Sequence, residues 1–282
     1  MLDINFTERR NTMGDNILKE TISILKDKYG DELDKITVER AVFGLFFTGV
    51  KLSNGDAGVS YTPLKALSSA VCCPSSAATM PRAGKLIGMP VSYYFEDMFK
   101  GGELKKTFGI AVINALTYAY EENYDIEYGK DPVDHLGLEE GSFTVVVGAL
   151  VPYIKYLKKN KRDFAILELD PSVLKQDELQ YHVSGKEADE AVSKADYLII
   201  TGVTLINDTL EDILSKAKDD CEIAVVGPTI SMYPEPLFKR GVDHIGGVKV
   251  TDADRLLDVL SEGGSGYHFF GKSAEKITLN KE

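Results

Sequence analysis

The second half of the chain alternates short, continuous hydrophobic runs with segments whose hydrophobic residues recur at helical spacing. Continuous runs fit strands buried on both faces, and strands separated by helices are typical of a parallel sheet covered on both sides. Because crossovers in such sheets are right-handed, we predict a doubly wound, Rossmann-like parallel sheet. The predicted strands are Phe143–Val147, Phe164–Leu169, Tyr197–Thr201, Glu222–Val226 and His244–Val248, with helices near 152–160, 186–194, 208–218, 234–240 and 252–261.

The first half has a less regular pattern. Hydrophobic residues share one face of a predicted helix at 13–28, and a longer helix is predicted at 103–121. Between the helices, two β-rich runs flank Asn54-Gly55, a dipeptide that favours a hairpin turn. The pattern therefore predicts a small α+β domain.

A polar segment at 123–140 separates the two patterns. It is interrupted by Gly129, Pro132 and Gly137, a composition typical of domain linkers. We therefore predict an α+β domain at 1–137 and a Rossmann-like domain at 138–282.

Charge and hydropathy narrow the classes of partner. The 282 residues carry a formal net charge of −12, which disfavours nucleic acid because phosphate neutralisation supplies most of the affinity for it. No apolar run approaches the roughly 20 residues of a membrane span. The N-terminal sequence lacks the apolar stretch of a secretory signal, so we expect a cytoplasmic protein with no membrane partner. The sequence does not determine the oligomeric state, and it is compatible with a homo-oligomer.

Cysteine and histidine usage does not predict a preformed metal site. The three cysteines are Cys72, Cys73 and Cys221, and the four histidines are scattered without zinc-ligand spacing. An odd, sparse cysteine set also argues against a disulfide framework. Cys72 and Cys73 fit small packed residues near a turn, with transient binding of a soft metal as the alternative.

Several blocks of sequence together resemble one known family. They are Gly148 after the first predicted strand, "ELDP" at 168–171, "TGVTLINDTL" at 201–210, "GPT" at 227–229 and "FTGVK" at 47–51. The family carries the label heavy-metal chelation, and its function is not established. The resemblance covers nearly the whole chain, and the block at 201–210 is its most specific part.

The resemblance implies a fold and a place for a ligand. The N-terminal domain is similar to the N-terminal domain of enolases, and the Rossmann-like domain is partly similar to methyltransferases. A ligand site is implied between the two domains. The implied role is the making or processing of pterin-, flavin- or siderophore-like chelators.

The carboxyl ends of the predicted parallel strands are the expected ligand site. Of the glycines in the dinucleotide-binding motif GxGxxG, this loop has only Gly148, which disfavours binding of the diphosphate of NAD or FAD. The helix after it begins near Val151-Pro152 without a side-chain cap, so the amides of Tyr153 and Ile154 are expected to be open to water or a ligand. The candidate ligand-binding residues at these ends are Gly148, Asp170, Thr201, Gly202, Thr204, Gly227 and Pro228.

Asp170 is 22 residues after Gly148, close to the offset at which an acidic residue binds a ribose hydroxyl in dinucleotide sites. The alternative is an Asp-Pro turn opening without a ligand. In the block at 201–210, Asp208 is predicted to cap a helix, which frees Thr204 and Asn207 to face the cleft. Alternatively, Asn207 is itself the cap and Thr204 closes a turn.

The small domain contributes candidate charged groups. Glu39 is a candidate general base, and Lys51 is a candidate partner for a negative charge on the substrate. Solvated charges that guard the edges of the sheet are the alternative interpretation of both. With Asn207, these residues form the candidate catalytic set.

Three hypotheses follow. The leading hypothesis is that an interdomain cleft binds a small heterocyclic or carboxylated molecule, which is condensed or hydrolysed in chelator metabolism. The expected partner is this small molecule, either free or as a metal complex. The sequence assigns no cofactor and no metal ligand. The second is a non-catalytic protein that binds a metal or metal complex. The third is an S-adenosylmethionine-dependent methyltransferase, which the acidic residue at 170 favours and the glycine-poor loop disfavours.

Overall fold

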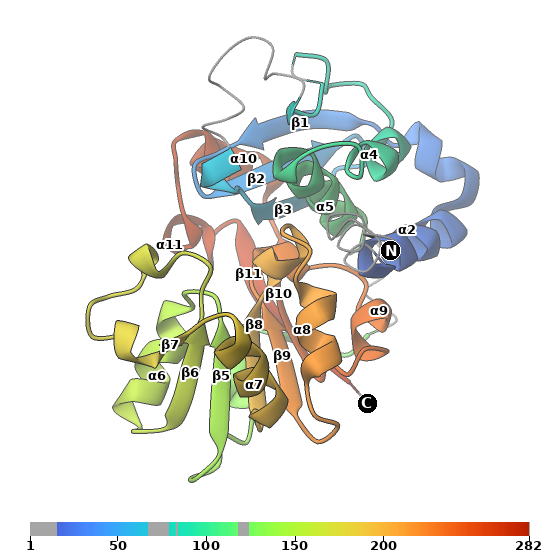
Figure 1. Cartoon of the computed structure of the whole chain (residues 1–282). Coiled ribbons are helices and arrows are strands. Elements are labelled where there is room, and N and C mark those ends of the chain that lie inside the picture. Colours follow the sequence, from blue (N-terminus) through green and yellow to red (C-terminus); the bar gives the residue numbers. More distant parts are fainter. Residues whose placement is uncertain (1–15, 67–78, 83, 118–123, 282) are drawn as a thin grey trace, which may run out of the picture.

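The chain forms a small unit with an antiparallel sheet and a larger unit with a mostly parallel sheet (Figure 1). The computed structural model describes residues 16–66, 79–82, 84–117 and 124–281. Cys72 and Cys73 lie outside the described residues. The predicted combination of a small α+β unit and a doubly wound, Rossmann-like sheet is confirmed.

The small unit is built around three antiparallel strands in the order β1-β2-β3. Helix α5 packs on β2 and β3, and α10, from near the end of the chain, packs on β1 and β2. Close approach explains two glycines: a Cβ on Gly58 would lie 2.3 Å from the carbonyl oxygen of Ala111 in α5, and one on Gly49 would lie 2.7 Å from Leu257 in α10. The elements are α2 (Asn16–Tyr29), β1 (Val38–Phe43), β2 (Phe47–Leu52), β3 (Ala57–Tyr61), α4 (Val91–Asp97), α5 (Glu103–Thr117) and α10 (Ala253–Ser261).

The larger sheet has eight strands among the described residues, in the order β4-β11-β10-β9-β8-β5-β6-β7. From β10 to β7 all neighbours are parallel. The strands are β4 (Ile126–Tyr128), β5 (Phe143–Val147), β6 (Asp163–Leu167), β7 (His182–Val183), β8 (Tyr197–Thr201), β9 (Glu222–Val226), β10 (His244–Val250) and β11 (Ala274–Asn280). The remaining helices are α6 (Val151–Lys159), α7 (Lys186–Lys194), α8 (Leu210–Lys216), α9 (Glu235–Phe238) and α11 (Gly266–Phe269).

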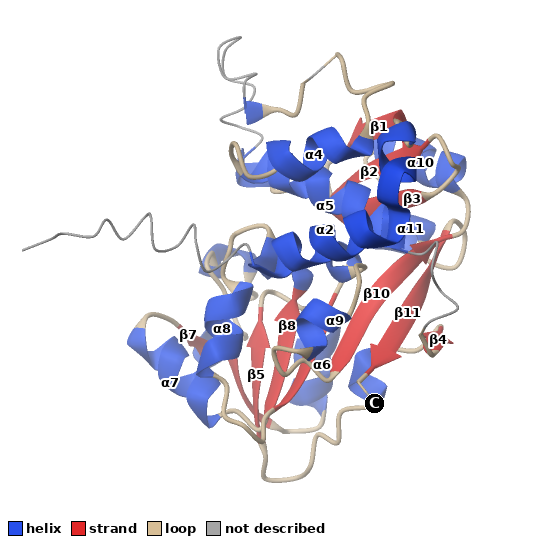
Figure 2. Cartoon of the chain, turned by 90° about the vertical axis from the view of Figure 1, so that its right-hand side faces the viewer, coloured by secondary structure: helices blue, strands red, loops and turns tan. Residues whose placement is uncertain are grey.

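The order of the six parallel strands is that of the Rossmann fold. The chain runs outward from β5 through β6 to β7, then returns to the other side of β5 and runs through β8 and β9 to β10. The direction of winding therefore changes between β5 and β8, which makes this pair the topological switch point. The parallel strands end on the side that faces the small unit (Figure 2).

Two antiparallel strands extend the sheet beyond the predicted pattern. β11 pairs with β10, and β4 pairs with β11. The chain thus enters the larger sheet at Ile126, ahead of residue 138 where we placed the start of the second domain.

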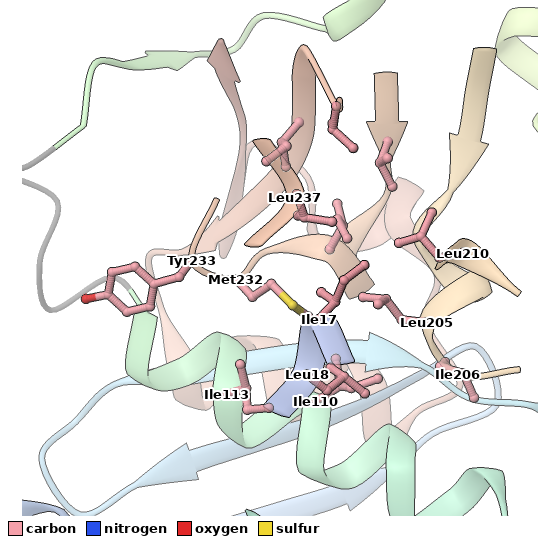
Figure 3. Packing of buried hydrophobic residues seen from close by; sticks show 14 of the residues in the cluster. Ile17, Leu18, Ile110, Ile113, Leu205, Ile206, Leu210, Met232, Tyr233 and Leu237 are labelled. Atoms are coloured by element: carbon pink, nitrogen blue, oxygen red, sulfur yellow. The ribbon is translucent and has the colours of Figure 1, made fainter. Parts of the chain in front are cut away.

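One hydrophobic core joins the two units. Side chains of α2 and α5 in the small unit pack with the loop after β8 and with α8 and α9 in the larger one (Figure 3). Glu211 of α8 strengthens this junction, because its carboxylate accepts a 2.9 Å hydrogen bond from the amide of Ile17 in the first turn of α2. In the described part of the chain, no helix combines the length and the apolar character needed to cross a membrane.

Candidate functional site

A pocket of about 530 Å³ lies at the switch point, at the carboxyl ends of β5, β6 and β8. We call it the switch-point pocket. Its outer walls come from α7, from the start of α8 and from the segment that joins β7 to α7. Three side chains of the sequence-predicted set, Thr201, Thr204 and Asn207, line it together with the backbone of Gly148.

Gly148 shapes the inner end of this pocket. Its φ of +97° lies in the region that favours glycine, and a Cβ there would lie 2.7 Å from Cγ2 of Thr201. The prediction that the amides after this loop are open to a ligand is wrong, because the amides of Tyr153 and Ile154 both donate to the carbonyl of Leu150 at 3.1 Å. The start of α6 is thus satisfied by its own backbone.

Glu168 is a pocket residue that the sequence interpretation missed. It follows β6 directly and lines the switch-point pocket. Its Oε1 accepts from the amide of Asp170 at 3.0 Å, and its main-chain oxygen lies 2.9 Å from Nε2 of His182, another lining residue. The signal was present in the spacing, since Glu168 stands 20 positions after Gly148.

Asp170 lies near the pocket without belonging to its lining. Its Oδ1 accepts from the amide and the hydroxyl of Ser172, and Nζ of Lys65 in the small unit lies 2.8 Å from Oδ2. The ion pair with Lys65, followed by the Ser172 hydrogen bonds, lowers the pKa of Asp170 to about 2. Asp170 therefore helps to connect the two units.

The block at 201–210 folds differently from the predicted capping pattern. Thr204 Oγ1 donates to the carbonyl of Thr201 at 2.7 Å and so closes a turn, as the alternative interpretation held. Asn207 accepts through Oδ1 from the hydroxyl of Thr209 at 2.7 Å. The predicted cap by Asp208 is wrong: Thr209 precedes α8 without a side-chain cap bond.

Asp208 instead forms an ion pair with Lys106 of α5, a buried residue of the small unit. Its φ of +61° is unusual for a residue other than glycine. The tertiary charge pair therefore holds the loop next to Asn207 in a conformation that a helix cap would not adopt. Both Lys65 and Lys106 thus bring positive charge from the small unit to loops of the switch-point pocket.

Tyr61, at the end of β3, faces the same region. Burial raises the pKa of its phenol, and the carboxylates of Glu168 and Glu103 raise it further. The amide of Tyr61 donates to Oγ1 of Thr229 at 3.0 Å. The end of β3 is therefore held against the larger unit close to Glu168.

A second pocket of about 340 Å³ lies on the other side of the β5–α6 loop from the switch-point pocket. Gly227 and Pro228 of the sequence-predicted set line it, together with the backbone of Gly246 and Gly247. We call it the glycine pocket. The sequence-predicted ligand residues are therefore divided between two pockets rather than gathered in one.

The remaining predicted residues line neither pocket. Lys51 forms ion pairs of 2.9 Å with Glu39 of β1 and with Asp254 of α10. These contacts bind the small sheet to α10. Gly202 packs against Ile230, since a Cβ there would lie 3.0 Å from its amide nitrogen.

The described residues do not fit a directly bound heavy-metal ion. Within 16–66, 79–82, 84–117 and 124–281, no three His, Cys, Asp or Glu side chains are grouped so that they could hold an ion. Cys221, the cysteine that the structure describes, is buried, and burial raises its pKa to about 12. Its thiol is therefore protonated at neutral pH and is a poor ligand.

Comparison with known proteins identifies the family. A model of the DUF364 family, described as "putative heavy-metal chelation", matches residues 131–279. The chain belongs to this family. A second model, DUF4213, with the same description, matches residues 26–117.

The similar proteins agree with this assignment. An uncharacterized protein of Methanocaldococcus jannaschii is 33% identical over 186 residues, which cover 64% of this chain and 67% of that protein. Two solved DUF364 proteins of unknown function share the fold. The one from Pyrococcus horikoshii has a TM-score of 0.72 at 20% identity and covers 94% of this chain and all of its own. The one from Desulfitobacterium hafniense has a TM-score of 0.69 at 18% identity and covers 93% of this chain and all of its own.

Proposed function

We propose that the switch-point pocket binds a small heterocyclic or carboxylated organic molecule. The observation that carries this proposal is the pocket's position, because ligands of open parallel sheets bind where the winding direction changes. Its volume of about 530 Å³ suits a small molecule. A bare metal ion needs a tight set of ligands instead, which the described residues do not provide. In this proposal, heavy-metal chelation involves an organic chelator or its precursor.

The chemistry of the walls supports a flat, partly polar ligand. Val183, Val203 and Ile213 supply apolar surface to the pocket, which can pack against a ring. Asn207 has its Oδ1 engaged by Thr209, and no described residue accepts from its amide nitrogen. That nitrogen can donate to a ring carbonyl or a carboxylate. Condensation or hydrolysis of such a ligand is the reaction that we propose for the site.

Glu39 and Lys51 have a structural role in this proposal. Their ion pairs with each other and with Asp254 connect β1 and β2 to α10. Lys65 and Lys106 of the small unit pair with Asp170 and Asp208 in loops beside the pocket, and these carboxylates offset their positive charges. The residues that line the pocket itself all belong to the larger unit.

Thermal unfolding with defined probes tests this function. The probes are 6-carboxypterin, riboflavin, 2,3-dihydroxybenzoate and zinc chloride, each added to the whole chain and to two variants. Ala188→Phe fills the switch-point pocket from α7, and Lys130→Phe adds a ring at the glycine pocket as the matched control. We expect an organic probe to raise the Tm of the wild type and of Lys130→Phe but not of Ala188→Phe, because a ligand stabilises only the state that binds it.

Two outcomes would contradict the proposal. One is an organic probe that stabilises Ala188→Phe as strongly as the wild type, which would place its site elsewhere. The other is stabilisation by zinc chloride alone, with no organic probe effective. Asn207→Ala sharpens the test, since loss of its donor should weaken binding of the probe; the shift in Tm is compared with the free variant, because the change also removes the acceptor of the Thr209 hydroxyl.

A further inference from the structure

We infer that the ligand of the switch-point pocket carries a ribose, whose 2′- and 3′-hydroxyls bind the Glu168 carboxylate, and that it carries no diphosphate. This inference rests on the proposed function, because it names the class of molecule that the same pocket takes. Three features of the larger unit support it. They are the position of Glu168, the free capacity of its carboxylate and the state of the β5–α6 loop.

Glu168 occupies the position that recognises ribose in a Rossmann fold. The strands follow the Rossmann order from β5, so β6 is the second strand of the series. Glu168 is the first residue after β6 and stands 20 positions after Gly148. In dinucleotide sites, an acidic residue about 20 positions after the first loop binds the ribose hydroxyl. Asp170 is excluded from this role because its carboxylate is engaged by Lys65 and Ser172.

The Glu168 carboxylate can accept further hydrogen bonds. Asp170 donates its amide to Oε1, and among the described residues no donor is bonded to Oε2. A carboxylate has room for about four hydrogen bonds, so two hydroxyl donors fit. The contact between His182 and the main-chain oxygen of Glu168 holds the loop in place before a ligand arrives. Vicinal hydroxyls match two adjacent carboxylate oxygens.

The β5–α6 loop lacks a cradle for a diphosphate. The amide of Leu150 donates to the carbonyl of Gly148 at 2.8 Å, and that of Val151 donates to Ala149 at 2.9 Å. The next two amides of α6 with a hydrogen both donate to Leu150. Phosphate sites at helix starts need such amides to point at the anion. The ligand is therefore a nucleoside, or a nucleoside with an uncharged or cationic substituent.

The rest of the pocket suits the base. Apolar side chains of Val183, Val203 and Ile213 line the part formed by the β7–α7 segment, the β8 end and α8. Lys216 joins the two helices there, with its Nζ 2.8 Å from Asp189 of α7 and 2.6 Å from Asp212 of α8. This bridge supports walls between which a flat base can lie.

Calorimetric titration of the whole chain tests the inference. The probes are adenosine, guanosine, cytidine and uridine with their 2′-deoxy forms, and ADP. We expect at least one ribonucleoside to bind about 10- to 100-fold more tightly than its deoxy form, which is the effect of losing a hydrogen bond to a charged group. ADP should bind no more tightly than adenosine.

Two variants test whether the Glu168 side chain causes the preference for ribonucleosides over their 2′-deoxy forms. Glu168→Gln keeps the shape and removes the charge, so the preference for ribose should fall to about threefold or less. Glu190→Gln alters an exposed residue of α7, paired with Lys194, and should leave the preference unchanged.

The outcomes separate this inference from the proposed function. If 6-carboxypterin binds the wild type but not Ala188→Phe while no nucleoside binds, the ribose inference is wrong and the pocket assignment stands. If ribonucleosides bind and Glu168→Gln keeps the full preference for ribose, the role of Glu168 is wrong. If neither probe class binds the wild type, both proposals fail.

Discussion

The two pockets on either side of the β5–α6 loop differ in what their polar groups already do. In the glycine pocket, Tyr153 donates to Oδ1 of Asp131 at 2.6 Å, and Lys276 donates to Oδ2 at 3.2 Å. In the switch-point pocket, the side chains of Glu168 and Asn207 each accept one internal hydrogen bond and keep further capacity. Pockets at neighbouring strand ends can therefore have opposite chemistry: one is satisfied internally, and the other is able to bind a polar ligand.

The attachment of the small unit differs on the same two sides. Toward the glycine pocket, the buried amide nitrogen of Asn114 lies 2.8 Å from the carbonyl of Val59 and 3.2 Å from that of Pro228. Toward the switch-point pocket, the Lys65–Asp170 pair is solvent-accessible, with the Lys65 side chain 81% exposed. Exposed pairs contribute little to stability. The Lys106–Asp208 pair on the same side is more buried, with the Lys106 side chain 8% exposed. We infer that the Asn114 amide attaches the small unit on the first side, and that the Lys106–Asp208 pair is the main polar attachment on the second.

The largest expected effect is a difference in the free energy of unfolding between alanine variants of two glycines at these strand ends. Both have positive φ, +97° at Gly148 and +114° at Gly227. Gly148→Ala adds a Cβ 2.7 Å from Thr201, whereas a Cβ at Gly227 would have no atom of the described residues within 4 Å apart from its neighbours in the chain. We expect backbone strain of about 1–3 kcal/mol in each variant. Overpacking should add about 1–3 kcal/mol in Gly148→Ala alone. Urea unfolding of both variants measures the difference, and equal losses would contradict the close approach of Thr201.

Asn114→Ala should have the next largest effect. It removes the donor to buried carbonyl groups of β3 and of the turn at Pro228, and each buried group left without a partner costs about 1–3 kcal/mol. Asn160→Ala removes a matched amide at an exposed helix end and should change the free energy of unfolding by about 0.5 kcal/mol or less. Urea unfolding compares the two variants. Similar losses would show that the buried contact does not hold the small unit.

The smallest expected effect is the pH dependence of the Lys65–Asp170 pair. The folded-state pKa of Asp170 is lowered from 3.8 to about 2, so its contribution to stability is present above pH of about 4 and is lost as the pH falls toward about 2. The difference in Tm between the wild type and Asp170→Asn should therefore be constant near neutral pH and should close on acidification. A difference that grows as the pH falls would contradict the pairing.

Much of the larger sheet could be predicted from hydrophobic runs. Phe143–Val147, Tyr197–Thr201 and Glu222–Val226 have the predicted bounds, because each is a continuous buried run with polar ends. β4 and β7 have three and two residues, too few to form a pattern. β11 has no regular alternation of buried and exposed residues, and its pairing with β10 depends on a tertiary contact that no local pattern contains.

The site was harder to predict, and two residues show why. The second strand was predicted to end at Leu169 but ends at Leu167, so the acidic residue at its end is Glu168 rather than Asp170. A shift of two positions changed the residue assigned to the ligand. Asp208 matches a helix-cap pattern, but its ion pair with Lys106, about 100 residues away in sequence, determines its conformation instead.

Native mass spectrometry of the protein, purified from its own host without denaturation, tests the central claim most directly. We expect the wild type and Lys130→Phe to carry the same organic mass, and Ala188→Phe to lack it, because the added ring occupies the switch-point pocket. An organic mass present in all three proteins, or a metal ion held by all three without any organic mass, would contradict the account.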